Sequence, residues 1–436
     1  MGRNDSSLRR VSTSSGEHSG TPSSTESVVV KDLSSAPSVR VPGFQFAGVA
    51  SGIKESGKPD VAVIYAERPV SVAAAFTTNV VQAAPVQIAR EHVKSGRLQA
   101  IVVNSGNANA FTGAAGVRDA RTMCRVAAAA LRISPRAVLP CSTGRIGVPL
   151  PMERVTEGIR AACQQLSPDG FAAALAAIMT TDSFPKFSQR TLSIGGQVVT
   201  IAGMAKGAGM IAPRLAIAPH ATLLAFLFTD AALSSATLRA VLRTILPTTF
   251  NAAVVDGDTS TNDTVVFLAS GQTSLERIST SSRDFASLAE AAHDVAADLA
   301  RMVVRDGEGA TRVVDIVVRG AHNDAEAARA ADAVARSPLC KAAFYGGDPY
   351  MGRVVCALGY SGAHFDPNRI RIYLEDLLVV DRGRELVASI EEQAQRIVQR
   401  PNFRLTIDLR CGNGQAVRMC SDLTEAYVRF NSAYRT

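Results

Sequence analysis

Near the middle of the 436-residue chain the sequence runs His220-Ala221-Thr222-Leu223-Leu224-Ala225-Phe226-Leu227-Phe228. The apolar run Leu223–Phe228 has the length and composition of a buried strand. A small residue, Ala221, and a hydroxyl residue, Thr222, come directly before this run, where the chain has to bend to enter a sheet. The stretch therefore predicts a buried strand with a threonine at its start.

The pattern around this stretch indicates a mixed α/β protein. Further apolar runs predict strands near 61–65, 100–103, 138–140, 198–202, 314–318, 370–380 and 404–410, the last turning through Gly412-Asn413-Gly414 back into 416–420. Periodic segments predict helices near 115–132, 152–165, 168–179, 234–246, 284–304 and 323–336. Helices come in groups between groups of strands. This favours the α+β type of α/β fold, with stacked sheets flanked by helices, over a doubly wound nucleotide-binding fold.

Composition argues against several classes of protein. The 46 Lys and Arg residues give a net charge of +7 against 39 Asp and Glu, but they form no basic block, so we expect no nucleic-acid partner. No apolar run approaches the roughly 18 residues that cross a bilayer, so we expect no membrane segment. The 7 cysteines are scattered without a C-x-x-C pair, which argues against disulfides and structural zinc and favours a reducing, cytoplasmic compartment.

Residues 1–40 differ from the rest of the chain. They hold twelve serines and almost no aliphatic residues before Val28. Such a segment cannot bury enough apolar surface to fold, so we interpret residues 1–40 as a disordered Ser-rich tail. The tail lacks the apolar centre of a secretory signal, while its Ser and Arg content leaves import into an organelle open.

Several short clusters of Gly, Ser, Thr and Asn interrupt the apolar background. An ordinary turn explains each one alone, but so many in one chain indicate loops that converge on a site. The clusters are Thr77–Asn79, Asn104–Asn109, Ser142–Gly144, Met179–Asp182, Lys206–Met210, Asp256–Asp263 and Asp306–Thr311.

Familiar catalytic and metal-binding motifs are absent from the sequence. Lys206 precedes its glycines, unlike the lysine of a Walker loop. The run that begins at Asp256 resembles a calcium loop, but Thr261 and Phe267 stand where such a loop needs glycine and glutamate. The 6 histidines form no H-E-x-x-H motif, and no G-x-S-x-G elbow is present. We therefore expect neither a catalytic metal nor a Ser-His-Asp triad.

A threonine hydroxyl can act without a histidine when the threonine is the first residue of a chain. Its own α-amine, with a pKa of about 8, then serves as the base. An internal threonine reaches that state only if the chain is cut directly before it. Thr222 is the best candidate, because a small residue precedes it and an apolar strand follows it. A buried threonine that merely opens a strand is the alternative.

Taken together, the motifs resemble those of one family, the self-cleaving ornithine acetyltransferases (glutamate N-acetyltransferases) of arginine biosynthesis. The resemblance runs from about Gly43 to Thr436 and includes Phe76–Asn79, Asn104–Ala110, Ser142–Gly147, Met179–Lys186, Ala205–Pro213, Ala221–Phe226, Val255–Thr264, Asp306–Thr311 and Asn431–Thr436. It implies a sandwich of sheets between helices, of the N-terminal-nucleophile type.

The resemblance also implies that the chain cuts itself at the Ala221-Thr222 bond. Residues 41–221 would then belong to an α chain and residues 222–436 would form a β chain that begins with Thr222. Two of each would assemble into a heterotetramer. Thr222 would take an acetyl group from N-acetylornithine and pass it to glutamate without a cofactor. Whether acetyl-CoA also serves as a donor stays open.

Site residues are implied where the sequence agrees with the family pattern. Thr222 matches the nucleophile, and Thr143 and Gly144 match the pair that stabilises the oxyanion. Lys206 matches a substrate-binding lysine, and Glu308 matches a carboxylate of the site. The remaining matches to substrate contacts are Thr180, Thr181, Asn431 and Thr436. No metal ligand is implied.

The sequence departs from the family's usual pattern in a few places. Arg214–His220 lengthens the segment before the expected cleavage site, Asp348–Arg353 carries Tyr-Met in place of Asn-Trp, and Arg312 replaces a lysine. Two alternatives therefore stay open. One is a diverged self-processing amidase or acyltransferase with a different donor or acceptor, and the other is an uncleaved, non-catalytic binding protein.

Overall fold

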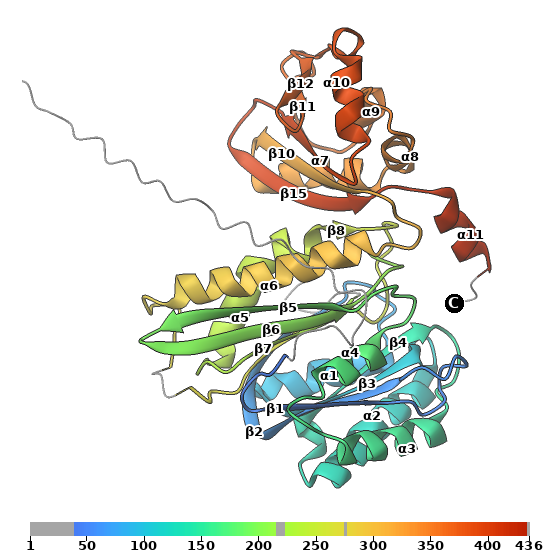
Figure 1. Cartoon of the computed structure of the whole chain (residues 1–436), viewed down its shortest axis with the longest axis vertical. Helices are drawn as coiled ribbons and strands as arrows, with labels where there is room; N and C mark the ends of the chain where they lie inside the picture. Colours follow the sequence, from blue (N-terminus) through green and yellow to red (C-terminus); the bar gives the residue numbers. More distant parts are fainter. Residues whose placement is uncertain (1–38, 215–222, 274–276, 434–436) are drawn as a thin grey trace, which may run out of the picture.

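The computed structural model describes residues 39–214, 223–273 and 277–433, which form a body and a C-terminal lobe (Figure 1). The body holds one large sheet between helices. The lobe, drawn in orange and red, holds a second sheet with its own helices. None of the described helices is long and apolar enough to cross a bilayer.

The strand order of the body sheet does not follow the sequence. The strands lie in the order β4-β3-β2-β9-β7-β6-β5, and β1 pairs with β2 from outside this path. β7 pairs in parallel with β9 and antiparallel with β6, so both of its edges are hydrogen-bonded. The bounds are β1 Phe44–Val49, β2 Val61–Phe76, β3 Arg97–Asn107, β4 Val138–Arg145, β5 Lys186–Ile194, β6 Gln197–Lys206, β7 Leu224–Thr229 and β9 Thr264–Ala269.

The body sheet folds into two layers at the long strand β2. Its register with β3 shifts between Tyr65 and Val70, and its second part, Ser71–Phe76, pairs with β9. The exposed stretch Glu67–Pro69 lies at this shift. No described strand pairs with this stretch, so the missing N–H of proline costs the sheet no hydrogen bond. One apolar core contains Ile64 from the first part of β2 and Phe226 from β7, so the two parts of the sheet face each other across it.

Alternation along the strands explains why this arrangement buries both faces of the sheet. Ala62 and Ile64 belong to the core between the layers, whereas Val61 and Val63 belong to an outer core. The core between the layers is rich in aromatic rings. Phe46 lies edge-on to Phe171 and to Phe228, with ring centroids 5.2 Å apart in both pairs.

Helices cover both outer faces of the two layers (Figure 1). α5 (Ser235–Ile245) and α6 (Phe285–Arg305) pack on the layer of β5, β6 and β7. α2 (Gly113–Leu131) and α3 (Met152–Gln164) pack on the layer of β1 to β4. Two shorter helices, α1 (Ala84–His92) and α4 (Phe171–Ile178), contribute to the core between the layers. Helices therefore cover both outer faces of the body sheet.

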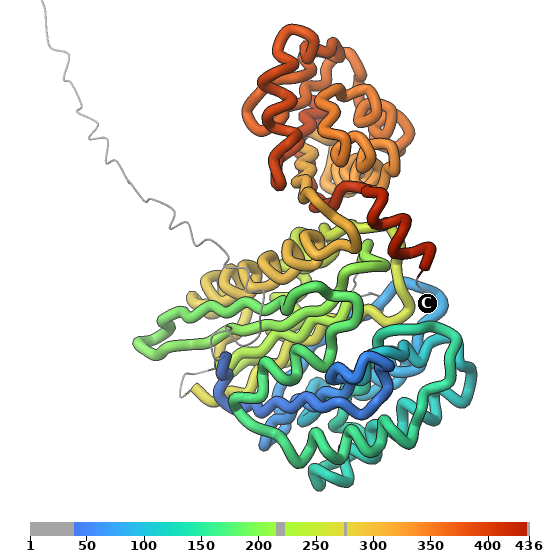
Figure 2. Tube along the Cα trace, turned by 45° about the vertical axis from the view of Figure 1, so that its right-hand side comes forward, coloured from blue at the N-terminus to red at the C-terminus, as the bar shows by residue number. Residues whose placement is uncertain are grey.

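The C-terminal lobe is built on the sheet β13-β12-β11-β14-β10-β15-β8. The short strand β8, at one edge of this sheet, comes between the body strands β7 and β9 in the chain. A segment that connects two strands of the body therefore supplies one edge strand of the lobe. The last helix, α11 (Glu425–Ala433), leaves the lobe and runs to one end of the body (Figure 2), and none of its residues is buried. The other bounds are β8 Ala253–Val254, β10 Val313–Ala321, α7 Asp324–Arg336, α8 Pro338–Gly346, α9 Gly352–Gly359, β11 Arg371–Leu374, β12 Leu377–Asp381, β13 Arg384–Glu385, α10 Glu391–Val398, β14 Asn402–Asp408 and β15 Gly414–Ser421.

The expected α/β fold with stacked sheet layers flanked by helices is confirmed, and one prediction about its strands is wrong. The segment 370–380 is not one strand, because β11 and β12 form a hairpin that turns at Glu375, whose φ is 49°. The strands at 404–410 and 416–420 run in opposite directions, as the turn through Gly412–Gly414 predicts, and β10 lies between them. Residues 1–38, which make up nearly all of the expected tail, lie outside the described residues.

We expect Phe228→Ala to lower the free energy of unfolding by about 3–5 kcal/mol, because it removes a ring that is fully buried between the layers. Phe111→Ala is the matched control, since the Phe111 side chain is 78% exposed and its loss changes stability by only about 0.5 kcal/mol. Urea unfolding of both variants measures the difference. Similar losses at the two positions would contradict this assignment of the core.

Candidate functional site

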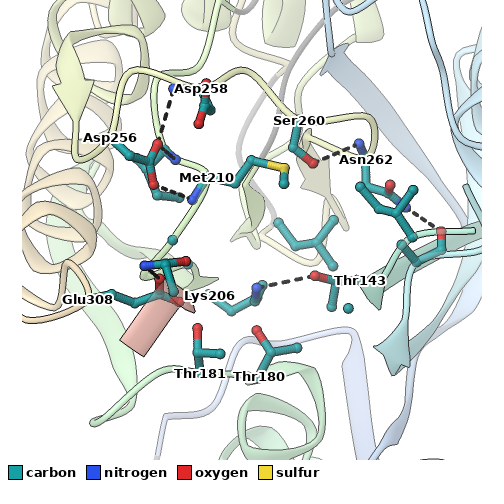
Figure 3. Close-up of a pocket in the computed structure, with 18 of the residues that line it drawn as sticks. Thr143, Thr180, Thr181, Lys206, Met210, Asp256, Asp258, Ser260, Asn262 and Glu308 are labelled. Carbon is teal, nitrogen blue, oxygen red and sulfur yellow. Dashed lines mark hydrogen bonds between the residues drawn. The ribbon is translucent and has the colours of Figure 1, made fainter. Parts of the chain in front are cut away.

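All but one of the polar clusters line a single cavity of about 260 Å³ at the ends of β4 and β6 (Figure 3). The exception is Thr77–Asn79, which lies behind the wall of the cavity. There the Asn79 side-chain amide donates a hydrogen bond to the Thr259 carbonyl at 2.8 Å. Loops from distant parts of the sequence thus meet at one site, as the sequence indicated. The lining residues include Thr143, Gly144, Thr180, Thr181, Lys206, Asp256, Asn262, Glu308 and Asn431.

Thr143 and Gly144 lie at the end of β4, beside the end of β3. Gly144 pairs with Gly106 in the parallel register of these strands. Its φ is +131°, and a Cβ atom there would lie 2.3 Å from the Gly106 carbonyl carbon and 2.5 Å from the Asn107 nitrogen. Only glycine fits, because a side chain would collide with backbone that cannot move aside. The bend leaves both Thr143 and Gly144 in the cavity wall.

Lys206 ends β6, and its ammonium group lies inside the cavity beside Thr143. The Nζ atom donates a hydrogen bond to the Thr143 Oγ1 atom at 3.2 Å (Figure 3). The lysine is 8% exposed. Burial lowers the pKa of Lys206 below its usual range, although the carboxylate of Asp182 acts in the opposite direction. A threonine hydroxyl, a glycine amide and a buried lysine therefore lie together at this point.

The loop Asp256–Asp263 forms the opposite wall. The Asp256 carboxylate accepts the N–H groups of Met210 and Ile211 at 2.6 and 2.8 Å. The Asn262 amide donates to the Ala108 and Ser142 carbonyls at 2.6 and 2.8 Å. The Asn262 contacts hold the loop against the backbone directly before Thr143. The loop therefore supports the position of Thr143 through backbone hydrogen bonds.

Thr180 and Thr181 follow α4 and lie at the bottom of the view of the cavity in Figure 3. The Thr180 N–H donates to the Asp182 Oδ2 atom at 2.8 Å, and the Gly207 N–H donates to the Asp182 Oδ1 atom at 2.7 Å. One buried carboxylate therefore joins the threonine loop to the residue after Lys206. Both Thr180 and Thr181 line the cavity.

Glu308 and Asn431 come from different parts of the chain and meet at the cavity. Glu308 follows α6, and Asn431 belongs to α11. The Asn431 side-chain amide donates to the Glu308 Oε2 atom at 3.0 Å. The site thus carries a carboxylate at one side and the Lys206 ammonium at the other. This arrangement suits a small molecule that carries both a cationic and an anionic group.

Three of the expected site residues, Ala221, Thr222 and Thr436, lie outside the described residues, as does most of the lengthened segment before them. Their described neighbours are in place. The Leu223 carbonyl accepts the Thr264 N–H at 2.5 Å, and Leu224 lines the cavity.

The sequence reasoning assigned no role to Asp182, Lys186, Asp256 or Asn262, although each belongs to a quoted motif. Their side chains bind backbone groups or one another across the site, so only the fold brings them together. Among the described residues, no group of three or more His, Cys, Asp and Glu side chains could hold a metal ion. The groups available at the cavity are hydroxyls, amides, carboxylates and an amine.

Asp263 is an unusual acid behind this cavity. It is fully buried, and neither of its carboxylate oxygens has a hydrogen-bond partner in the described part of the chain. Burial raises the pKa of Asp263 well above its usual range, against the attraction of the Lys206 ammonium. The folded state therefore favours the protonated acid.

We expect Asp263→Asn to stabilise the protein near pH 7.5 and to have little effect near pH 4. The wild-type protein loses about 1.4 kcal/mol of stability for each pH unit between the unfolded and folded pKa values, because Asp263 must take up a proton to fold. Asparagine has no such requirement, so the gain grows with pH. Chemical unfolding at both pH values measures it. Asp258→Asn, at an exposed position of the same loop, controls for the lost charge. A variant that is less stable than wild type at pH 7.5 would contradict the prediction.

Comparison with known proteins identifies the family. The profile of the ArgJ family matches residues 45–436. The chain is 48% identical over 396 residues to the arginine biosynthesis bifunctional protein ArgJ of Symbiobacterium thermophilum, covering 90% of this chain and 97% of the relative. It is 45% identical to the ArgJ protein of Geobacter sulfurreducens, covering 91% of this chain and 100% of the relative.

Among solved structures, an ornithine acetyltransferase from Mycobacterium tuberculosis, crystallised with ornithine, is 41% identical. The match covers 40% of this chain and 94% of that chain, with a TM-score of 0.37. The family profile and the curated relatives each span about nine-tenths of the sequence. The chain belongs to the ArgJ family of arginine biosynthesis bifunctional proteins.

Proposed function

We propose that this chain is a self-cleaving ornithine acetyltransferase, which moves an acetyl group from N-acetylornithine to glutamate through an ester on Thr222. Membership of the ArgJ family supports this activity. The observation that carries it is the grouping of Thr143, Gly144 and Lys206 around a cavity that Leu224 also lines. Thr222 precedes Leu224 by two positions in the sequence, which supports Thr222 as the nucleophile of this site.

Cleavage comes first in the proposed sequence. The Thr222 hydroxyl attacks the Ala221 carbonyl carbon, the peptide C–N bond breaks, and the acyl group moves from nitrogen to oxygen. Water then hydrolyses the ester and leaves a carboxylate on Ala221. The products are residues 1–221 and residues 222–436, and the second fragment carries a free α-amine on Thr222. That amine lies on the same residue as the hydroxyl that it has to activate.

Acetyl transfer then follows in two half-reactions. The α-amine accepts the hydroxyl proton, and the Thr222 oxygen attacks the acetyl carbonyl of N-acetylornithine. The tetrahedral intermediate collapses, the proton passes to the departing nitrogen, and ornithine leaves an acetyl ester behind. The amine of glutamate attacks this ester, N-acetylglutamate leaves, and the proton returns to the Thr222 oxygen. The acetyl group comes from one substrate and goes to the other, so the cycle requires no cofactor.

The described residues supply the remaining roles in this proposal. The Thr143 hydroxyl and the Gly144 N–H stabilise the negative oxygen of each tetrahedral intermediate. The Lys206 ammonium and the Glu308 carboxylate bind the charged groups of the amino-acid substrates, and Asn431 orients Glu308 through their 3.0 Å hydrogen bond. Thr180, Thr181 and Thr436 are further proposed substrate contacts, and the threonine hydroxyls suit polar groups between the two charges.

The proposal also covers a second activity, the cellular location and the oligomeric state. The relatives are named bifunctional proteins, and we propose transfer of an acetyl group from acetyl-CoA to glutamate as a second activity of this chain. We also propose a cytoplasmic location and a heterotetramer of two copies of each fragment. Product assays separate the reaction from that of an amidase, because an amidase releases acetate whether or not glutamate is present. Assays with acetyl-CoA as the only donor test the second activity.

Cleavage has a direct test. We expect the purified protein to contain two fragments, one of which begins at Thr222, and we expect Thr222→Ala to abolish both cleavage and transfer. Intact-mass measurement and N-terminal sequencing of both fragments check this. A single wild-type species near 45.8 kDa would sink the cleavage proposal and favour an uncleaved binding protein. Full transfer activity in Thr222→Ala would refute the role of this threonine.

Thr143→Ala tests the oxyanion assignment. We expect kcat to fall on the order of 10²–10³, because a donor to the developing negative charge is lost, while KM for both substrates changes little. Steady-state kinetics measure the two parameters. Thr77→Ala provides a threonine control outside the cavity wall. A rise in KM with unchanged kcat would instead assign Thr143 to substrate binding.

A further inference from the structure

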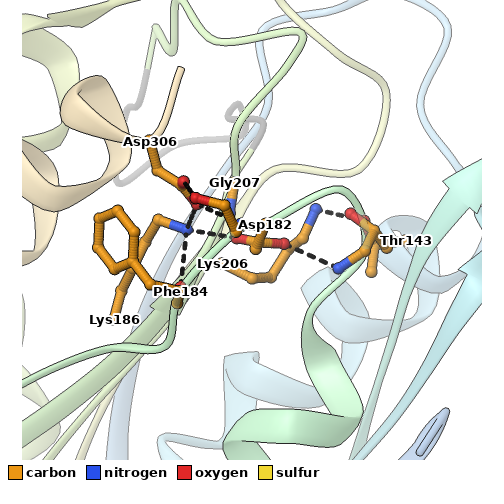
Figure 4. A network of polar contacts seen from close by, with 9 residues as sticks. Thr143, Asp182, Phe184, Lys186, Lys206, Gly207 and Asp306 are labelled. Atoms are coloured by element: carbon orange, nitrogen blue, oxygen red, sulfur yellow. Dashed lines mark hydrogen bonds and ion pairs between the residues drawn. The ribbon is translucent and has the colours of Figure 1, made fainter. Parts of the chain in front are cut away.

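Lys186 is a buried lysine beneath the site, and it lies outside the cavity. It begins β5, and its side chain has no exposed surface. Its Nζ atom lies 2.6 Å from the Asp182 Oδ1 atom and 2.5 Å from the Asp306 Oδ2 atom (Figure 4). The side chains of both acids are at most 2% exposed. The ammonium also lies over the Phe184 ring, 5.0 Å from its centroid.

The two acids reach different loops of the site. Asp182 accepts the N–H groups of Thr180 and Gly207, so it touches the substrate-contact loop and the residue after Lys206. Asp306 accepts the Ser183 N–H at 3.0 Å and follows the last residue of α6, two positions before Glu308. Through Lys186, the loops that carry Thr180, Lys206 and Glu308 share one buried ionic centre.

Such a centre is a costly way to stabilise a fold. Removing three charges from water carries a desolvation penalty that apolar side chains of the same size would avoid. Burial alone would raise the pKa of Asp182, but the ammonium groups of Lys186 and Lys206 hold it below its usual range. The carboxylate is therefore ionised, and its bonds to Thr180 and Gly207 keep their full strength. In return, the buried centre fixes the positions of the three loops relative to one another.

We propose that Lys186 is a positioning residue of the acetyl-transfer site, which holds Lys206, Glu308 and the Thr180 loop in register through Asp182 and Asp306. This proposal rests on the proposed function, because it concerns the placement of groups that would bind the substrates. Lys186 does not line the cavity. It reaches the site through the two acids. Burial lowers the pKa of Lys206, and the charge of Lys186 lowers it further. A misplacement of about 1 Å in the substrate-binding groups can cost on the order of 10² in rate.

The chain offers a matched control on the same two elements. Arg190 lies four residues after Lys186 in β5. Its Nη2 atom pairs with the Asp298 Oδ2 atom of α6 at 2.7 Å. Both side chains are partly exposed, and neither lines the cavity. This pair joins β5 to α6 as Lys186 and Asp306 do, but it reaches no loop of the site.

Three variants at Lys186 separate positioning from simple stability. Lys186→Met leaves two buried acids without their partner and tests the loss of the whole centre. Lys186→Met with Asp306→Asn removes one positive and one negative charge together, so it cuts the link to the residue after α6 while the net charge of the centre stays as in the wild type. Lys186→Arg keeps the positive charge and can bind both carboxylates. Arg190→Met is the control.

We expect the balanced double variant to fold and to cleave, with kcat/KM for N-acetylornithine and for glutamate about 100-fold below wild type. Lys186→Arg should recover most of that loss, and Arg190→Met should stay within about twofold of wild type. Melting temperatures show whether each variant is folded at the assay temperature. A folded double variant with nearly wild-type kcat/KM overturns the proposal. So does an activity loss in Arg190→Met as large as that in the double variant, or failure of every Lys186 variant to fold, since either result assigns the centre to stability alone. Wild-type protein without transfer activity would refute the proposed function itself, independently of any variant.

Discussion

The rest of the structure depends on the way β2 passes through both layers of the body. Its first part contributes Ile64 to the core between the layers, and its second part pairs with β9. β9 in turn fixes β7 through parallel hydrogen bonds. The end of β4 with Thr143 and the end of β6 with Lys206 therefore face each other across one cavity. Neither layer alone would hold both halves of the site.

Charge is distributed around this cavity in an uneven way. On one side, Lys186 is balanced by two carboxylates that are themselves tied to backbone N–H groups. On the other side, Asp263 is buried without a partner among the described residues. The low dielectric of the interior strengthens the paired charges and disfavours the unpaired one. The paired charges thus lie next to the loops of Thr180 and Lys206.

The sequence predicts the elements of this fold better than their connections. The apolar run at β7 is visible because an interior strand needs apolar residues on both faces, whereas the edge strand β5 contains the continuous polar run Ser188–Thr191 and gives no such signal. The turn at Glu375 was missed because apolar residues stand on both sides of it.

The same limit applies to the site. Thr143, Lys206 and Glu308 belong to recognisable motifs, and a loop that is rich in Gly and Thr can be expected to carry function. Their mutual contacts cannot be predicted this way. Lys186 and Asp306 are separated by 120 positions, and Asn431 and Glu308 by 123, so only the topology of the sheet determines that they meet. A lysine at the start of a strand ordinarily faces water, and nothing local distinguishes this one.

The strand order of the body sheet has a consequence for the two proposed fragments. Strands β4, β3 and β2 come from residues before the cut, β9 and β7 come from residues after it, and β6 and β5 again come from residues before it. Strands of the two fragments would lie side by side in one sheet, so each fragment would supply hydrogen-bond partners for strands of the other. Dilution alone would not separate them, because parting them requires that the shared sheet unfold. After denaturation, neither polypeptide could rebuild the sheet by itself, so recovery would become a bimolecular reaction whose rate depends on protein concentration.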